Sequence, residues 1–136
     1  MQNSQNKLQS RISYEMNNTI IGKNGEDLAV DFLQKQGYKI IERNFRIRGG
    51  EIDIIALHKD TLVYVEVKTR TSHEFGLPEE SVNYFKINFL KRAANFYRLK
   101  RANKIKLPDL ERIDVVAVDL SQQKTPQIRL ITNIGF

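Results

Sequence analysis

The 136-residue sequence contains no cysteine, which excludes disulfide scaffolds, thiolate metal sites and cysteine nucleophiles. It also lacks an apolar run of the ~18–20 residues that a membrane-spanning helix needs. The N-terminal segment MQNSQNKLQSRISYEM has no apolar core of the kind found in signal peptides. We therefore expect a cytoplasmic protein without membrane contact, and the length suits one compact domain.

Acidic residues are absent from the segment Ser81–Pro108, which carries eight of the 22 Lys and Arg residues. The remainder has 14 basic and 16 acidic residues, so this segment accounts for the whole excess of the +6 chain. Such a bias is compatible with a polyanionic partner. It is equally compatible with a solvated helix face whose basic C-terminal end suits the helix dipole.

Hydrophobic periodicity predicts the element order α-β-β-β-α-β-β, with helices at 19–36 and 82–102 and strands at 38–48, 51–57, 62–69, 113–120 and 127–132. Residues 1–18 are polar without a helical period, and we interpret them as an N-terminal extension to a single domain at 19–136. Short connections predict an antiparallel three-strand meander, and the second helix a crossover to a parallel fourth strand. The expected class is α/β, a mixed sheet flanked by helices.

The second and third predicted strands are joined at Lys59-Asp60, and an even-length loop brings their apolar faces together. In that register Ile54 faces Val65, and Ile52 shares the face of Ile54 because side chains alternate along a strand. The same register fixes the positions of the charged residues.

Asp53 then lies opposite Glu66, and Glu51 opposite Lys68, with Cβ atoms ~5 Å apart. Like charges at this distance favour a cation between them, and Mg²⁺ prefers carboxylate oxygens. Lys68 could orient a water molecule or neutralise developing charge. The alternative is a solvated hairpin face with a cross-strand salt bridge.

Glu26 borders the apolar stripe of the first predicted helix. A helix lying on the meander could direct this carboxylate at the acidic end of the hairpin. The alternative is an ordinary glutamate near a helix start.

Several motifs together resemble a known family: Gly22-x-x-Gly25-Glu26, Arg43-Asn44-Phe45-Arg46, Gly50-Glu51-Ile52-Asp53-Ile54-Ile55-Ala56, Val65-Glu66-Val67-Lys68-Thr69-Arg70, Phe75-Gly76-x-Pro78 and Ile113-Asp114-Val115-Val116-Ala117-Val118. The sequence is similar to the YraN-type family of predicted bacterial endonucleases, which resembles archaeal Holliday junction resolvases. The resemblance implies a restriction-endonuclease-like PD-(D/E)XK nuclease with an αβββαβ core, the order predicted above.

The resemblance also implies site residues. The ligands of Mg²⁺ or Mn²⁺ would be Asp53, Glu66 and the main-chain carbonyl of Val67. The catalytic residues would be Glu26, Asp53, Glu66 and Lys68. Glu51 would support these ligands or the fold.

The implied partner is DNA, branched or otherwise structured, and the likeness to resolvases implies a homodimer. Candidate phosphate contacts are Arg46, Arg48, Arg70, Lys86, Lys91, Arg92, Arg98, Lys100 and Arg101. Arg43 and His73 could extend that surface. The spacing of the aromatic residues in the second helix favours burial against the sheet rather than base stacking, for Phe85, Phe89, Phe96 and Tyr97.

The expected function is therefore a metal-dependent, structure-selective DNA endonuclease that hydrolyses phosphodiester bonds. The first alternative is a catalytically silent module of the same fold that binds DNA or assembles with a protein. The second alternative is an RNA-processing nuclease.

Overall fold

The computed structural model describes residues 2–122 and 125–136, and it describes no side chain of residues 2 and 13–22. The chain forms helix α1 (Gln2–Lys35), strands β1 (Lys39–Ile47), β2 (Gly50–His58) and β3 (Thr61–Arg70), 3-10 helix η1 (Pro78–Ser81), helix α2 (Tyr84–Arg101), and strands β4 (Leu110–Asp119) and β5 (Gln127–Ile131). The predicted order is confirmed.

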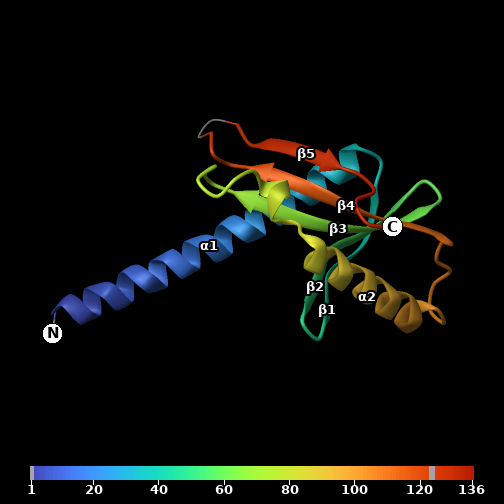
Figure 1. The fold of residues 1–136 in the computed structure, drawn as a ribbon, viewed down its shortest axis with the longest axis horizontal. Helices are drawn as coiled ribbons and strands as arrows, with labels where there is room; N and C mark the ends of the chain where they lie inside the picture. The colour runs from blue at the N-terminus through green and yellow to red at the C-terminus, as the bar shows by residue number, and fades with distance from the viewer. Residues whose placement is uncertain (1, 123–124) are drawn as a thin grey trace.

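One five-stranded sheet, in the order β1-β2-β3-β4-β5, forms the centre of the molecule (Figure 1). Neighbouring strands are antiparallel except for β3 and β4, which are parallel. The helix-containing connection between β3 and β4 is thus the predicted crossover, since parallel neighbours cannot be joined by a tight turn. The mixed sheet with its antiparallel meander agrees with the expected α/β class.

The two helices cover different apolar clusters of the sheet. Ala29 and Leu33 of α1 pack in a cluster that includes Val65. Leu90 and Tyr97 of α2 pack in a second cluster. Apolar residues of β2 and β3 contribute to both clusters, because side chains alternate between the two sides of a strand.

Helix α1 ends where the sequence predicted, because Gly37 has a φ of 90° and the backbone N–H of Tyr38 donates to the carbonyl of Leu33 at 2.9 Å. Glycine adopts this left-handed conformation without the steric penalty of a side chain.

Helix α1 begins at Gln2, earlier than the predicted start at residue 19, so the polar segment 1–18 is helical in its described residues. The N-terminal part of the helix projects beyond the sheet (Figure 1). Residues 3–12 are exposed on all sides, which explains the lack of an amphipathic period. Gln, Lys, Arg and Leu are nevertheless strong helix formers, and no proline interrupts the segment.

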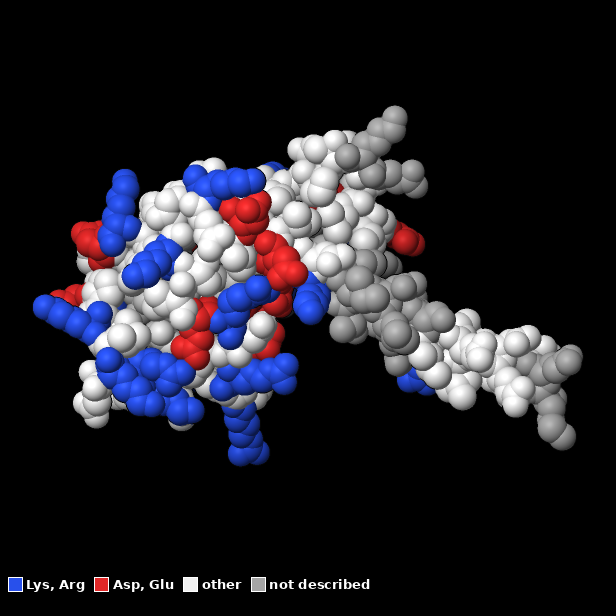
Figure 2. All heavy atoms as spheres, turned by 180° about the vertical axis from the view of Figure 1, so that it is seen from behind, with Lys and Arg blue, Asp and Glu red and all other residues white. Residues whose placement is uncertain are grey.

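None of the helices that the described residues form is both long and apolar enough to cross a membrane. On the face drawn in Figure 2, the Lys and Arg side chains lie mainly over the body of the domain, interspersed with Asp and Glu, rather than along the described part of the projecting helix.

Candidate functional site

Three carboxylates meet where α1 crosses the sheet. Glu26 comes from α1 and Glu51 and Asp53 from β2, and one oxygen of each lies within 4.8 Å of the others. The side-chain amide of Asn44 donates to Glu26 at 3.2 Å and to Glu51 at 3.3 Å. Arg46 forms an ion pair with Glu51 at 3.1 Å. We call Glu26, Glu51 and Asp53 the acidic cluster.

The position of Glu26 depends on the close approach of α1 to β3 at the preceding residue. A Cβ atom on Gly25 would lie 2.0 Å from Oγ1 of Thr69, far inside van der Waals contact. Only glycine fits here without a shift of the Thr69 side chain or of the elements that carry the two residues. The Gly25-Glu26 pair of the motif therefore combines a packing requirement with a carboxylate.

Asp53 is the buried member of the acidic cluster. Its side chain is buried, and its Oδ2 accepts a hydrogen bond from the backbone N–H of Val67 at 2.8 Å. Burial raises the pKa of Asp53 to about 8, and the charges of Glu66 and Glu26 act in the same direction. A cation beside this carboxylate would relieve both the desolvation and the repulsion.

The predicted hairpin register is confirmed from His58 with Thr61 to Ile54 with Val65, where the described pairing of β2 and β3 ends. Asp53 instead uses its side chain to accept from Val67. The alternation changes at the same point, because Ile52 packs in the cluster under α2 and Ile54 in the cluster under α1. Our prediction that Ile52 and Ile54 share a face is therefore wrong.

Glu66 lies beside the acidic cluster and is only 3% exposed. Its Oε1 pairs with the ammonium of Lys68 at 3.5 Å and with that of Lys86 at 3.3 Å. Its Oε2 is buried and has no hydrogen-bond partner among the described residues. Glu66 is not one of the three carboxylates within 4.8 Å of one another, but its charge contributes to the raised pKa of Asp53.

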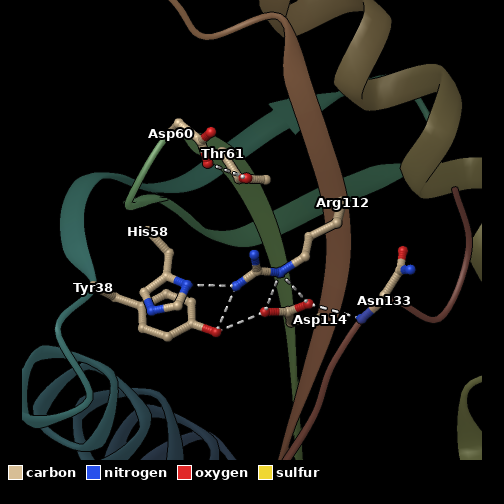
Figure 3. Close-up of polar contacts among 7 residues, drawn as sticks. All are labelled: Tyr38, His58, Asp60, Thr61, Arg112, Asp114 and Asn133. Carbon is tan, nitrogen blue, oxygen red and sulfur yellow. Dashed lines mark hydrogen bonds and ion pairs between the residues drawn. The ribbon is translucent and has the colours of Figure 1, made fainter.

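A second buried carboxylate, that of Asp114, differs from Glu66 in its hydrogen bonding. Asp114 on β4 accepts from Tyr38 at 2.8 Å, from Arg112 at 3.1 Å and from the backbone N–H of Asn133 at 2.9 Å (Figure 3). Arg112 also bonds Nδ1 of His58. Both oxygens of Asp114 are thus satisfied within the protein, and this motif residue ties β4 to the end of α1. In Glu66, by contrast, Oε2 has no hydrogen-bond partner among the described residues.

The expected phosphate contacts fall into different environments. Arg98 and Arg101 form ion pairs with Glu111 and Glu42. Lys86 contacts Glu66, and Nε of Arg70 is buried with no hydrogen-bond partner in the described part of the chain. The remaining cations are exposed, namely Arg46, Arg48, Lys91, Arg92 and Lys100.

The sequence missed the role of Asn44 and one contact of Lys86. Asn44 received no role, although asparagine is rare inside strands, and its φ of 54° shows a backbone conformation that few residues adopt. Lys86 was predicted as a phosphate contact, and the structure adds a contact of its ammonium group with Oε1 of Glu66. Sequence alone could not place a helix residue beside a strand carboxylate.

The donor set suits a hard divalent cation. Every candidate ligand side chain here is a carboxylate, and such oxygens are the ligands that Mg²⁺ and Mn²⁺ prefer. The unsatisfied Oε2 of Glu66 and the raised pKa of Asp53 both indicate that the neighbouring lysines do not fully compensate the carboxylates. The acidic cluster is thus compatible with a metal centre.

Fold and site together define a mixed-sheet α/β protein in which a partly buried carboxylate cluster lies where α1 crosses the sheet. Residues 25–118 match the model of the family described as "Uncharacterised protein family UPF0102". The chain belongs to this family, which confirms the YraN-type resemblance.

Similar relatives carry the name UPF0102 protein. The one from Geobacter metallireducens is 45% identical over 118 residues, which cover 87% of this chain and 93% of the relative. The one from Caldicellulosiruptor bescii is 50% identical over 103 residues, covering 76% and 85%. The one from Alkaliphilus oremlandii is 48% identical over 108 residues, covering 79% and 91%.

Proposed function

We propose that the protein is a divalent-cation-dependent endonuclease that hydrolyses phosphodiester bonds in branched or otherwise structured DNA. The observation that carries the proposal is the buried Asp53 of the acidic cluster beside Glu66, whose Oε1 contacts two lysines while its Oε2 has no partner among the described residues. Carboxylates and ammonium groups side by side match the needs of phosphoryl chemistry, in which charge develops on phosphate oxygens.

The cation would be held by Asp53 and Glu66 with the carbonyl of Val67, and Glu26 and Glu51 lie close enough to adjust its surroundings. When bound, Mg²⁺ or Mn²⁺ supplies Lewis-acid stabilisation of charge on the phosphate. Glu66 has an oxygen free for this purpose, because Lys68 and Lys86 both contact Oε1.

The lysines have a separate part in the proposed chemistry. Lys68 and Lys86 line a cleft of about 420 Å³ together with Phe85, Phe89 and Arg92. A phosphate in this cleft would meet two ammonium groups that are already held in place by Glu66. Hydrolysis joins a water oxygen to phosphorus and releases one ester oxygen, and Lys68 would orient the water or neutralise the charge that develops.

The test is cleavage of four-way junction, single-stranded and nicked DNA with Mg²⁺, Mn²⁺ or EDTA. We expect cation-dependent cleavage, and a rate loss of at least ~100-fold for Asp53→Asn and for Lys68→Met. Asp60→Asn, an exposed carboxylate at the other end of the same hairpin, is the matched control and should cleave normally.

Cleavage in EDTA, or equal rates for wild type and both site variants, would contradict the proposal. DNA binding without cleavage under any of these conditions would leave the silent binding module as the function. Preferential cleavage of matched RNA would favour the RNA-processing alternative.

A further inference from the structure

Helix α2 presents two phenylalanines to solvent beside the candidate site. Phe85 is 80% exposed and Phe96 57% exposed, so our prediction that they belong to the core is wrong. Phe89 and Tyr97 of the same helix are buried as predicted. The helix is apolar on more of its circumference than the sheet covers.

The exposed phenylalanines share one face of α2 with a cation. Arg92 lies seven residues after Phe85, and Phe96 lies 11 residues after Phe85. The three side chains therefore lie within a sector of about 40° at 3.6 residues per turn. Phe85 and Phe96 are separated by about 16 Å along the axis at 1.5 Å per residue. We call Phe85, Arg92 and Phe96 the α2 stripe.

The α2 stripe runs between two hollows that share Arg92. The first is the cleft of about 420 Å³ that Phe85, Lys68 and Lys86 line beside Glu66. The second, of about 300 Å³, is lined by Phe96 with Arg46, Arg48 and Lys100. The described residues that line the two hollows include no carboxylate. The stripe therefore leads away from the candidate site with basic residues along both hollows.

Arg92 differs from the other cations of this surface in its partner. Of the residues that line the hollows, Arg46 pairs with Glu51, and Lys68 and Lys86 pair with Glu66. Arg98 and Arg101 are engaged by Glu111 and Glu42. Arg92 instead lies over the ring of the buried Phe89, 5.8 Å from its centroid. Its guanidinium is exposed and available to a polyanion.

We propose that the α2 stripe binds a single nucleic-acid strand, with unpaired bases stacked on Phe85 and Phe96 and the strand's phosphates held by Arg92 and its basic neighbours. A basic groove that follows the backbone and aromatic rings that stack on bases are the two elements of single-strand recognition. Bases in a duplex are stacked on one another and cannot also stack on protein rings.

This inference rests on the proposed function and names its substrate class: DNA with unpaired nucleotides next to the point of cleavage. Phe85 lies in the cleft that contains Lys68 and Lys86, so a strand on the stripe passes the candidate site. The separation of the two rings means that they hold different bases of that strand.

The experiment measures binding without cleavage. Single-stranded oligonucleotides that contain 2-aminopurine, and duplexes of the same sequence, are titrated with the full chain in EDTA. We expect tighter binding of the single strand and quenching of 2-aminopurine on stacking. Phe85→Ala and Phe96→Ala should each weaken single-strand binding by roughly 5- to 100-fold, and Phe85→Trp should retain the quenching.

Leu110→Ala is the control, because Leu110 is an exposed apolar residue at the start of β4, away from the stripe. Thermal unfolding checks each variant, and we expect little change because the substituted rings are exposed.

Equal binding by wild type and both alanine variants would overturn the inference, as would equal affinity for single strand and duplex. Absence of nucleic-acid binding would overturn it in favour of a protein partner on this face. Because the titration contains no divalent cation, failure of the stripe is distinguishable from failure of cleavage.

Discussion

Asn44 is the residue through which the acidic cluster is positioned. Its left-handed backbone lets one amide donate to both Glu26 and Glu51. Hydrogen-bond partners of metal ligands commonly contribute ten- to a hundredfold to metal affinity. Asn44 thus extends the candidate site beyond the carboxylates.

We expect Asn44→Gly to weaken the binding of Mn²⁺ by roughly tenfold while the fold is retained, because glycine adopts the same φ without strain. The measurement is the rise in Tm with Mn²⁺ concentration, which follows from binding to the folded state alone. Asn133→Gly is the matched control, with a φ of 56° and a position outside the acidic cluster. Equal Mn²⁺ responses of the two variants would contradict the prediction.

Asp119 gives the fold a pH dependence of its own. Hydrogen bonds from the side chain and the backbone N–H of Ser121, and then the contact with His73, lower the pKa of Asp119 to about 2. The folded state therefore favours the charged carboxylate. This stabilisation is fully present above the ordinary value of 3.8 and is lost as the pH falls toward 2.

We expect Asp119→Asn to lower Tm by about 2–5 °C at neutral pH, with a difference from wild type that shrinks below pH 4 and is lost as the pH falls through about 2. Thermal unfolding across this range measures the effect. Asp109→Asn, at an exposed carboxylate, should show no such dependence. A difference that grows on acidification would show that another group is responsible.

Among the elements, α1 and β3 approach each other closely at Gly25. Alanine inside a helix is normally about 1 kcal/mol more stable than glycine. The contact of Gly25 with Thr69 reverses this preference, because a Cβ would meet Oγ1 at 2.0 Å.

We expect Gly25→Ala to reduce the free energy of unfolding by about 1–3 kcal/mol. A double variant with Thr69→Ala should regain most of this loss, because Oγ1 is removed and the nearest remaining atom, the Cβ of residue 69, lies 3.1 Å from the added Cβ. Urea unfolding of both single variants and the double variant measures this coupling. Asn24→Ala, at the exposed neighbouring position, serves as the control. An additive double variant would argue against the contact.

The strands were predictable because Ile and Val mark them and because an even loop at Lys59-Asp60 leaves one register. The break in pairing between Asp53 and Ile54 was not predictable, since the side chain of Asp53 rather than its backbone accepts the hydrogen bond from Val67. Phe85 and Phe96 were misassigned for a related reason. Helical spacing reveals which residues share a face, but not which face the sheet covers.

At the scale of the whole molecule, Asp53, Glu66 and Lys68 could be brought together from the sequence because they belong to one hairpin. The role of Asn44 and the contact of Lys86 with Glu66 required the structure, since β1 and α2 reach the site through tertiary packing. The dimer implied by the resemblance stays a prediction, and sedimentation at micromolar concentration tests it.

The parallel pairing of β3 with β4 has a consequence for the chain as it is being made. Until α2 and β4 have emerged, β3 is an edge strand with a free row of backbone groups and the apolar run Leu62–Val67. Such runs promote edge-to-edge aggregation of unfinished chains. Glu66 places a charge within this run, and charges at such positions oppose aggregation. The carboxylate of the candidate site thus also protects the nascent sheet.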